Sequence, residues 1–280
     1  MTLEEFKINM PGYIQNLSDK EKSQNTINKY SLAVNNFIAY AEKTKKCEEI
    51  CKDCFIRYKE HLKAAYKPKT VNLYIVGLNQ YLKYLGTPDL CIKSLNIQSN
   101  NSLDNCITND EYKRMLDAAK KDKNITAYYV MRTLACTGMR IKGLSYITVK
   151  VLQKGSFTVT NKGKIRSIVI PNKICKELLG YCAEMDISDG YVFCGRNPQK
   201  IVHDSTVWRW CKKVATAANV DESKVFPHNL RHLFAREFME VHNDLPELAD
   251  ILGHSNLETT RIYTRTSVED KRNKMETLDL

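Results

Sequence analysis

No stretch of the 280-residue sequence approaches the about 20 consecutive apolar residues that a membrane-spanning helix needs. Residues 1–15 also lack the apolar core of a secretory signal peptide. A chain without either feature is expected in the reducing cytoplasm, where its ten cysteines remain thiols. The sequence therefore predicts neither a membrane protein nor a disulfide-stapled secreted domain.

The composition is that of a globular protein with excess positive charge. Hydrophobic residues make up 43% and charged residues 27%, which excludes a disordered or fibrous chain. The 43 Lys and Arg outnumber the 32 Asp and Glu, so the net charge is +11. This balance points to a polyanionic partner, although a solvated basic surface on an ordinary enzyme would have the same composition.

The first ninety residues carry helical periodicity and no hairpin signal. Apolar residues recur at helical spacing over Thr26–Glu42 and Lys69–Tyr84, and Cys51–Ala65 is a further candidate helix. We therefore predict a small helical domain over residues 1–97. The polar stretch that follows, residues 98–105, is the predicted linker.

The second half, residues 106–280, mixes helices with a small sheet. Thr108 is placed to cap a helix that runs to Lys120, with Glu111 three residues on, and Tyr128–Thr137 is a second apolar helix. The β-type runs Ser156–Thr160 and Ile165–Ile170 flank turn residues and predict a hairpin. The predicted fold class is therefore mainly α with a small β-sheet, in two domains.

Five elements of the second half stand out because their residue types suit phosphate chemistry. Taken singly, each has an ordinary structural explanation as a helix end, a turn residue or a packed side chain. In chain order they are TGMR at 137–140, NKGK at 161–164, HNLR at 228–231, LGH at 252–254 and, nine residues after that histidine, Tyr263.

Together and in this order, these elements resemble the tyrosine recombinase (phage integrase) family of site-specific DNA recombinases. The helical first half is similar to the family's core-binding domain. The sequence departs from the family at Gly143, where members usually carry an acidic residue three positions after the first arginine. The resemblance implies a two-domain fold of the family's type and the catalytic residues Arg140, Lys162, His228, Arg231, His254 and Tyr263.

The resemblance also implies the chemistry of these side chains. Tyr263 would attack a DNA phosphorus, giving an O-(3′-phospho-DNA)-tyrosine and a free 5′-hydroxyl. Arg140 and Arg231 suit the charge that develops on the phosphate, because a guanidinium is always protonated and offers a planar fork of donors. His254 would be a further donor, and His228 a donor or a proton acceptor.

The leaving 5′-oxygen needs a proton, and Lys162 on the hairpin turn is the candidate general acid. The phosphotyrosine conserves the energy of the broken bond, and the sequence contains no Walker-type glycine loop. Side chains supply the charge that a metal would otherwise supply. No cofactor and no metal are therefore expected.

The expected partner is double-stranded DNA with inverted-repeat core sites, bound by a homotetramer that could be monomeric when free. Val268, Met275 and Leu278 lie on one side of a short predicted helix, which would dock on a neighbouring subunit or on its own domain. An accessory DNA-bending or directionality protein is a candidate partner. The chain begins directly with the core-binding-like region, which favours a compact Xer-like or transposon integrase in the bacterial cytoplasm, integrating or excising a mobile element.

Two other classes remain open from the sequence. A monomeric topoisomerase would use the same tyrosine chemistry and relax supercoils without sequence preference. A DNA-binding regulator derived from a recombinase would bind without forming a covalent product, and the missing acidic residue at Gly143 would fit it.

Overall fold

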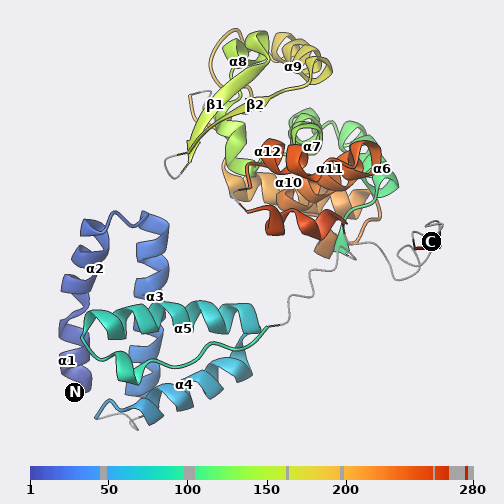
Figure 1. Cartoon of the computed structure of the whole chain (residues 1–280). Coiled ribbons are helices and arrows are strands. Elements are labelled where there is room, and N and C mark those ends of the chain that lie inside the picture. Colours follow the sequence, from blue (N-terminus) through green and yellow to red (C-terminus); the bar gives the residue numbers. More distant parts are fainter. Residues whose placement is uncertain are drawn as a thin grey trace. The chain divides into compact units, whose positions relative to one another are not determined.

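The computed structural model describes residues 1–44, 49–97, 105–161, 164–195, 199–254, 256–264 and 275–276 (Figure 1). The chain divides into two compact units, a first unit over Met1–Asn100 and a second unit over Asn101–Leu280. Helices dominate both, and the described strands form one small antiparallel sheet. The predicted fold class is confirmed. Most of the predicted linker, residues 98–104, lies outside the described residues.

The first unit is a helical bundle around an aromatic core. Its helices are α1 (Leu3–Ile8), α2 (Met10–Asp19), α3 (Gln24–Thr44), α4 (Lys52–Ala65) and α5 (Pro68–Tyr84). The last three contain the helices predicted from periodicity. Their apolar faces bury a cluster of rings with centroids 4.6–5.3 Å apart, among them Phe6, Phe37, Phe55, Tyr58 and Tyr81. Aromatic pairs of this kind stabilise a core beyond their buried area.

The second unit is built around one apolar helix, α7 (Ile125–Thr137), which packs against α6 (Asn109–Lys121), α9 (Asn172–Glu184), α10 (Asp204–Ala217) and α11 (Pro227–His242). Side chains of α7 are buried on several sides, as expected of a helix without a polar face. The unit also contains α8 (Val149–Lys154) and α12 (Leu245–Leu252). It also contains the short 3₁₀ segments η3 (Ile141–Tyr146), η4 (Glu222–Lys224), η5 (Leu257–Thr259) and η6 (Arg261–Thr264).

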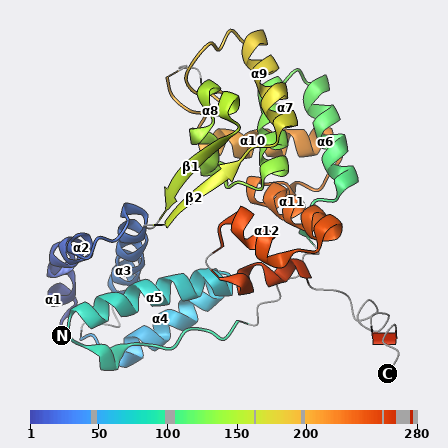
Figure 2. The ribbon, with the colours of Figure 1, turned by 45° about the horizontal axis from the view of Figure 1, so that its top comes forward.

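Local signals in the second unit behave as predicted. The Thr108 side chain accepts a hydrogen bond from the Glu111 N–H at the start of α6. The Glu111 carboxylate accepts one from the Thr108 N–H, which completes the capping box. Strands β1 (Ser156–Asn161) and β2 (Lys164–Val169) pair antiparallel, with Asn161 opposite Lys164 (Figure 2). The hairpin is confirmed, whereas Lys162 at its turn lies outside the described residues.

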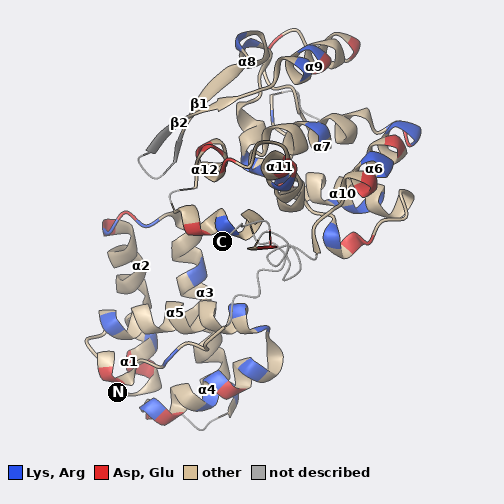
Figure 3. Cartoon of the chain, turned by 45° about the vertical axis from the view of Figure 1, so that its right-hand side comes forward, with Lys and Arg blue, Asp and Glu red and all other residues tan. Residues whose placement is uncertain are grey.

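No helix in the described ranges combines the length and the apolar character needed to cross a bilayer. Lys and Arg residues occur on helices of both units, α4 in the first and α6 and α11 in the second among them (Figure 3). The positive charge expected from the composition is thus available on each unit for contacts with a polyanion.

Candidate active site

Arg231 is the buried cation at the centre of the site. It lies on α11 and is 1% exposed. Its Nη1 donates to the carbonyl of Gly138 at 2.7 Å, and its Nη2 donates to the carbonyl of Leu252 at 2.6 Å. These carbonyls end α7 and α12, where unpaired C=O groups give a helix its negative pole. Two helix ends therefore hold one guanidinium and offset the cost of burying its charge.

The glycines of the TGMR and LGH elements create these helix ends. Gly138 and Gly253 take left-handed conformations, with φ of +60° and +63°, directly after α7 and α12. Glycine adopts this conformation without steric cost. At Gly138 there is also no space for a side chain, because a Cβ atom would lie 2.4 Å from Cδ1 of Phe234. The glycines thus turn the chain and present the carbonyls that bind Arg231.

His254 contacts Arg231 from the segment after α12. Its Nε2 lies 2.9 Å from Arg231 Nη2, and its Nδ1 lies 2.8 Å from Oγ1 of Thr260. A guanidinium can only donate, so Nε2 is the acceptor and Nδ1 carries the proton toward Thr260. Thr260 is fully buried and fixes the orientation of the imidazole ring.

Tyr263 points its hydroxyl at the second histidine of α11. The Tyr263 Oη atom lies 2.5 Å from His232 Nδ1, and the ring is 8% exposed. Burial raises the pKa of Tyr263 to about 12, although the nearby Arg231 acts in the opposite direction. The phenol is therefore protonated at neutral pH. The pKa of His232 falls to about 4 because burial, His228 and Arg231 all disfavour its cation.

His228 and Arg140 lie on the open side of the site, and both side chains are exposed. The His228 ring packs edge-to-face against His232, with centroids 4.6 Å apart. Desolvation and the charges of Arg231 and Arg140 lower the pKa of His228. The Arg140 side chain makes no hydrogen bond or ion pair within the described part of the chain. Its guanidinium is thus available to an incoming anion.

The fold therefore gathers five of the six predicted site residues. Arg231, His254 and Tyr263 lie within one network of hydrogen bonds and charges, and His228 and Arg140 border it. Lys162 lies outside the described residues. Elsewhere in the described ranges no three His, Cys, Asp or Glu side chains come together in a way that could hold a metal ion.

Two residues of the network were missed in the sequence. His232 follows Arg231 directly and lies four residues after His228, so the two imidazoles share one face of α11. That spacing is the signal available in the sequence, although two histidines four residues apart are also part of some metal-binding motifs. Thr260 carried no signal, because a threonine three residues before the tyrosine has no distinctive pattern.

Gly143, at the position where an acidic residue was expected, is buried and covered by Met139. A Cβ atom on Gly143 would lie 2.9 Å from Sδ and 3.2 Å from Cβ of Met139. The Gly143 N–H donates to the Arg140 carbonyl at 2.6 Å, so backbone holds the segment that carries Arg140. The methionine thus fills the space that a larger side chain would need.

We expect Gly143→Ala to destabilise the protein by about 1–3 kcal/mol, because overpacking forces Met139 to move. The cost should shrink in a Met139→Ala background, giving a coupling energy in a double-mutant cycle of thermal unfolding. Gly180 in α9 is the matched control, since no atom lies within 4 Å of its Cβ position and alanine there should be neutral or stabilising. Equal costs for Gly143→Ala in both backgrounds would contradict this account.

Comparison with known proteins identifies the family of this chain. Residues 105–270 match the phage integrase family, and residues 11–87 match the N-terminal SAM-like domain of phage integrases. Tyrosine recombinase XerA of Pyrococcus furiosus is 29% identical over 269 residues, which cover 92% of this chain and 90% of that protein.

Two solved structures show the same fold at lower identity. The Tn1549 transposon integrase in complex with transposon right end DNA has a TM-score of 0.71 and 17% identity, with 100% of each chain covered. A lambda integrase tetramer bound to a Holliday junction has a TM-score of 0.73 and 17% identity, covering 96% of this chain and 80% of that one. The chain belongs to the phage integrase family and is a tyrosine-type site-specific recombinase, an enzyme that cleaves and rejoins DNA strands.

Proposed function

We propose that Tyr263 is the nucleophile of strand cleavage and that the charge of the attacked phosphate is stabilised by Arg231, Arg140 and His254. The observation that carries this proposal is the network in which Arg231 contacts His254 and lies near Tyr263. Attack of Oη on phosphorus forms a 3′-phosphotyrosine and releases a 5′-hydroxyl. The same bond energy drives rejoining when that hydroxyl attacks the phosphotyrosine.

The resting contacts indicate how the phosphate enters. Arg231 Nη2 shares its donors between the Leu252 carbonyl and His254 Nε2. A phosphate oxygen competes with His254 for this donor, because an anionic acceptor makes the stronger hydrogen bond. His254 then has to present a proton at Nε2 to become a second donor. The Arg140 side chain is exposed and makes no hydrogen bond or ion pair in the described residues, so it can bind the phosphate together with Arg231 and His254.

Lys162 is proposed as the acid that protonates the leaving 5′-oxygen. The β1–β2 pairing supports this role, since Asn161 and Lys164 face one another across a two-residue connection that contains Lys162. A lysine ammonium on its four-carbon stem can deliver a proton to a bound substrate, which suits this role.

The test of the proposed function is covalent trapping. Incubated with a nicked recombination site in EDTA, the wild-type protein should form a protein–DNA adduct that survives denaturant, because side chains rather than a metal supply the charge. Tyr263→Phe should bind the site normally and form no adduct, because phenylalanine has no nucleophile. An adduct of unchanged yield in Tyr263→Phe contradicts the proposal, as does loss of wild-type cleavage in EDTA that magnesium restores.

The proposed partner is duplex DNA with inverted-repeat core sites, and the proposed assembly is a homotetramer on it. The transposon integrase and lambda integrase structures named above hold transposon end DNA and a Holliday junction, the latter in a tetramer. Basic side chains on both units support contacts with DNA from each. We propose integration or excision of a mobile element as the biological outcome, with an accessory DNA-bending or directionality protein as a further partner. We propose a cytoplasmic location because a sequence with ten cysteines and no signal-peptide core suits a reducing compartment.

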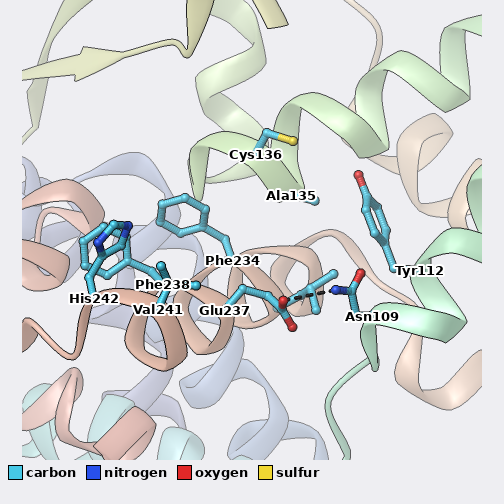
Figure 4. Close-up of a pocket in the computed structure, with 10 residues that line it drawn as sticks. Asn109, Tyr112, Ala135, Cys136, Phe234, Glu237, Phe238, Val241 and His242 are labelled. Atoms are coloured by element: carbon cyan, nitrogen blue, oxygen red, sulfur yellow. Dashed lines mark hydrogen bonds between the residues drawn. The ribbon is translucent and has the colours of Figure 1, made fainter. Parts of the chain in front are cut away.

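We further propose that the C-terminal tail joins the subunits through an apolar pocket of the second unit (Figure 4). The pocket has a volume of about 260 Å³, and Tyr112 of α6 and Phe234, Phe238 and Val241 of α11 line it. Val241 is 74% exposed, and Met275 of the tail is 71% exposed. An apolar wall and an apolar tail side chain, both open to solvent in one chain, support docking between chains.

Truncation after Thr266 should leave binding to one half-site unchanged, abolish cooperative binding to the full site and abolish strand exchange. Val241→Glu should reproduce this phenotype with the tail intact, because it places a charge in the pocket without disturbing the core. Half-site and full-site gel shifts, followed by a recombination assay, measure both variants. Normal recombination by the truncated protein would contradict the tail proposal, and weak half-site binding would instead indicate docking of the tail within its own subunit.

A further inference from the structure

The hydroxyl of the proposed nucleophile has one hydrogen-bond partner in the described part of the chain. Tyr263 Oη lies 2.5 Å from His232 Nδ1, a separation typical of a strong hydrogen bond. Arg231, one residue earlier on α11, binds the carbonyls at the ends of α7 and α12. Adjacent residues of one helix therefore address the two reacting partners, the phenol and the phosphate.

The family resemblance implies that His228 is a proton donor or a proton acceptor, and its contacts differ from those of His232. Its ring meets the His232 ring edge-to-face, and in the described ranges no hydrogen bond joins it to Tyr263. His228 is exposed, on the side of the site where Arg140 lies. It is thus positioned for the DNA phosphate, whereas His232 is positioned for the phenol.

The direction of the hydrogen bond follows from the protonation states. The Tyr263 phenol is protonated at neutral pH because burial raises its pKa to about 12, and His232 is neutral because its pKa falls to about 4. A neutral imidazole has one donor and one acceptor nitrogen. The phenol therefore donates to Nδ1, and Nε2 of His232 carries the ring proton.

We infer that His232 is the general base of cleavage, accepting the Tyr263 proton at Nδ1 as Oη attacks the phosphorus. This inference rests on the proposed function of Tyr263. The O–H bond breaks as Nδ1–H forms, the Oη–P bond forms as the P–O5′ bond breaks, and the leaving oxygen takes its proton from Lys162. In rejoining, the 5′-hydroxyl returns a proton to Lys162, and the His232 imidazolium returns its proton to Oη.

The occupied site makes His232 a stronger base than the resting site does. In the resting site, burial and the nearby His228 and Arg231 lower the pKa of His232. Burial and the cations of Arg231 and Arg140 lower the pKa of His228. A bound phosphate neutralises part of that positive field and so raises the proton affinity of His232 when the phenol must lose its proton. The titratable and charged groups that face this pair are His228 and Arg231 from α11, Arg140 from the segment after α7, and Cys106, which faces Tyr263.

The experiment separates proton acceptance from positioning. Asparagine places an amide oxygen near the position of Nδ1, so His232→Asn keeps an acceptor for the phenol and removes the base. We expect normal folding and half-site binding but single-turnover adduct formation at neutral pH slower by about 10²-fold or more. The rate of the variant should continue to rise with pH toward the pKa of the phenol, where hydroxide replaces the base, while the wild-type rate levels off.

A second substitution tests the same role from the side of the nucleophile. Fluorinated tyrosine at position 263 has a more acidic phenol and depends less on a base. We expect it to accelerate His232→Asn by a larger factor than the wild type. The matched control is His228→Asn on the same helix face. Fluorotyrosine should increase its cleavage rate by no more than the wild-type factor, because His228 acts on the phosphate rather than on the phenol.

Each outcome bears on one statement. Two results overturn the inference: a cleavage rate of His232→Asn within twofold of wild type, or an equal rate increase from fluorotyrosine in His232→Asn and in the wild type. In either case a Tyr263 adduct in the wild type still supports the proposed function. A larger gain in His228→Asn assigns the base to His228 and also overturns it. Absence of any wild-type adduct overturns both. If His232→Asn unfolds, His232→Gln carries the same comparison, with the same expected pH dependence and fluorotyrosine gain.

Discussion

Arg231→Lys should nearly abolish strand cleavage and also destabilise the folded protein. The guanidinium spans two carbonyls and one imidazole nitrogen, at 2.7, 2.6 and 2.9 Å, from a position that is 1% exposed. A lysine ammonium is a point charge and cannot reproduce this fork. Leaving a buried carbonyl without its donor costs about 1–3 kcal/mol. Loss of one preorganised donor to the phosphate slows the reaction by about 10²–10³-fold.

Denaturant unfolding and single-turnover cleavage of a nicked site measure the two effects. Arg236→Lys is the matched control, because Arg236 also lies on α11 and donates to a backbone carbonyl, that of Ile107 at 3.2 Å, which is not the carbonyl of a predicted site residue. This control should cleave at the wild-type rate. If Arg231→Lys were as stable and as active as the control, the guanidinium would be neither a structural link between helix ends nor a phosphate ligand.

Lys162→Ala should slow cleavage of ordinary DNA by about 10²–10⁴-fold, the range for loss of a general acid. Substituting sulfur for the bridging 5′-oxygen gives a leaving group that departs without a proton. On that substrate the variant should cleave within a few-fold of the wild type. Adduct formation on the two substrates under single-turnover conditions measures the ratio.

Lys164→Ala is the matched control for Lys162→Ala, because it also removes one positive charge from the hairpin. Lys164 begins β2 and pairs with Asn161 of β1. This variant should cleave both substrates like the wild type. Rescue of Lys164→Ala rather than Lys162→Ala would move the acid to the other lysine. His232→Asn provides a second contrast, because sulfur in the leaving group does not replace a base on the nucleophile, so that variant should stay slow.

Much of this protein follows from local signals in its sequence. Two helices of the first unit, α3 and α5, were predicted from apolar periodicity, and the start of α6 was predicted from the capping box of Thr108 and Glu111. The hairpin came from turn residues between two β-type runs. Each depends on interactions between residues a few positions apart, so the relevant physics is visible in a short window of sequence. The boundaries 1–97 and 106–280 and the roles of the site residues stay predictions.

The site motifs can be recognised in the sequence, but the tertiary contacts that their residues make cannot. In the sequence, Gly138 and Gly253 are consistent with ordinary helix ends. The fold brings the ends of α7 and α12 to the Arg231 guanidinium. Gly143 stood out as a missing acidic residue, while its neighbour Met139 fills that space. Packing of this kind depends on side-chain volumes across segments that pattern alone does not pair.

Residue type and short spacing are enough to identify the family, several helices and the five elements that carry phosphate chemistry. Which histidine contacts the nucleophile depends instead on how distant segments pack. His228 and His232 share a helix face and a residue type, and the approach of η6 brings Tyr263 to His232 Nδ1 and leaves His228 on the open side. A hydrogen bond is decided within a few tenths of an ångström, and that positioning comes from the packing of Tyr263 against α11 and α12 rather than from its spacing in the chain.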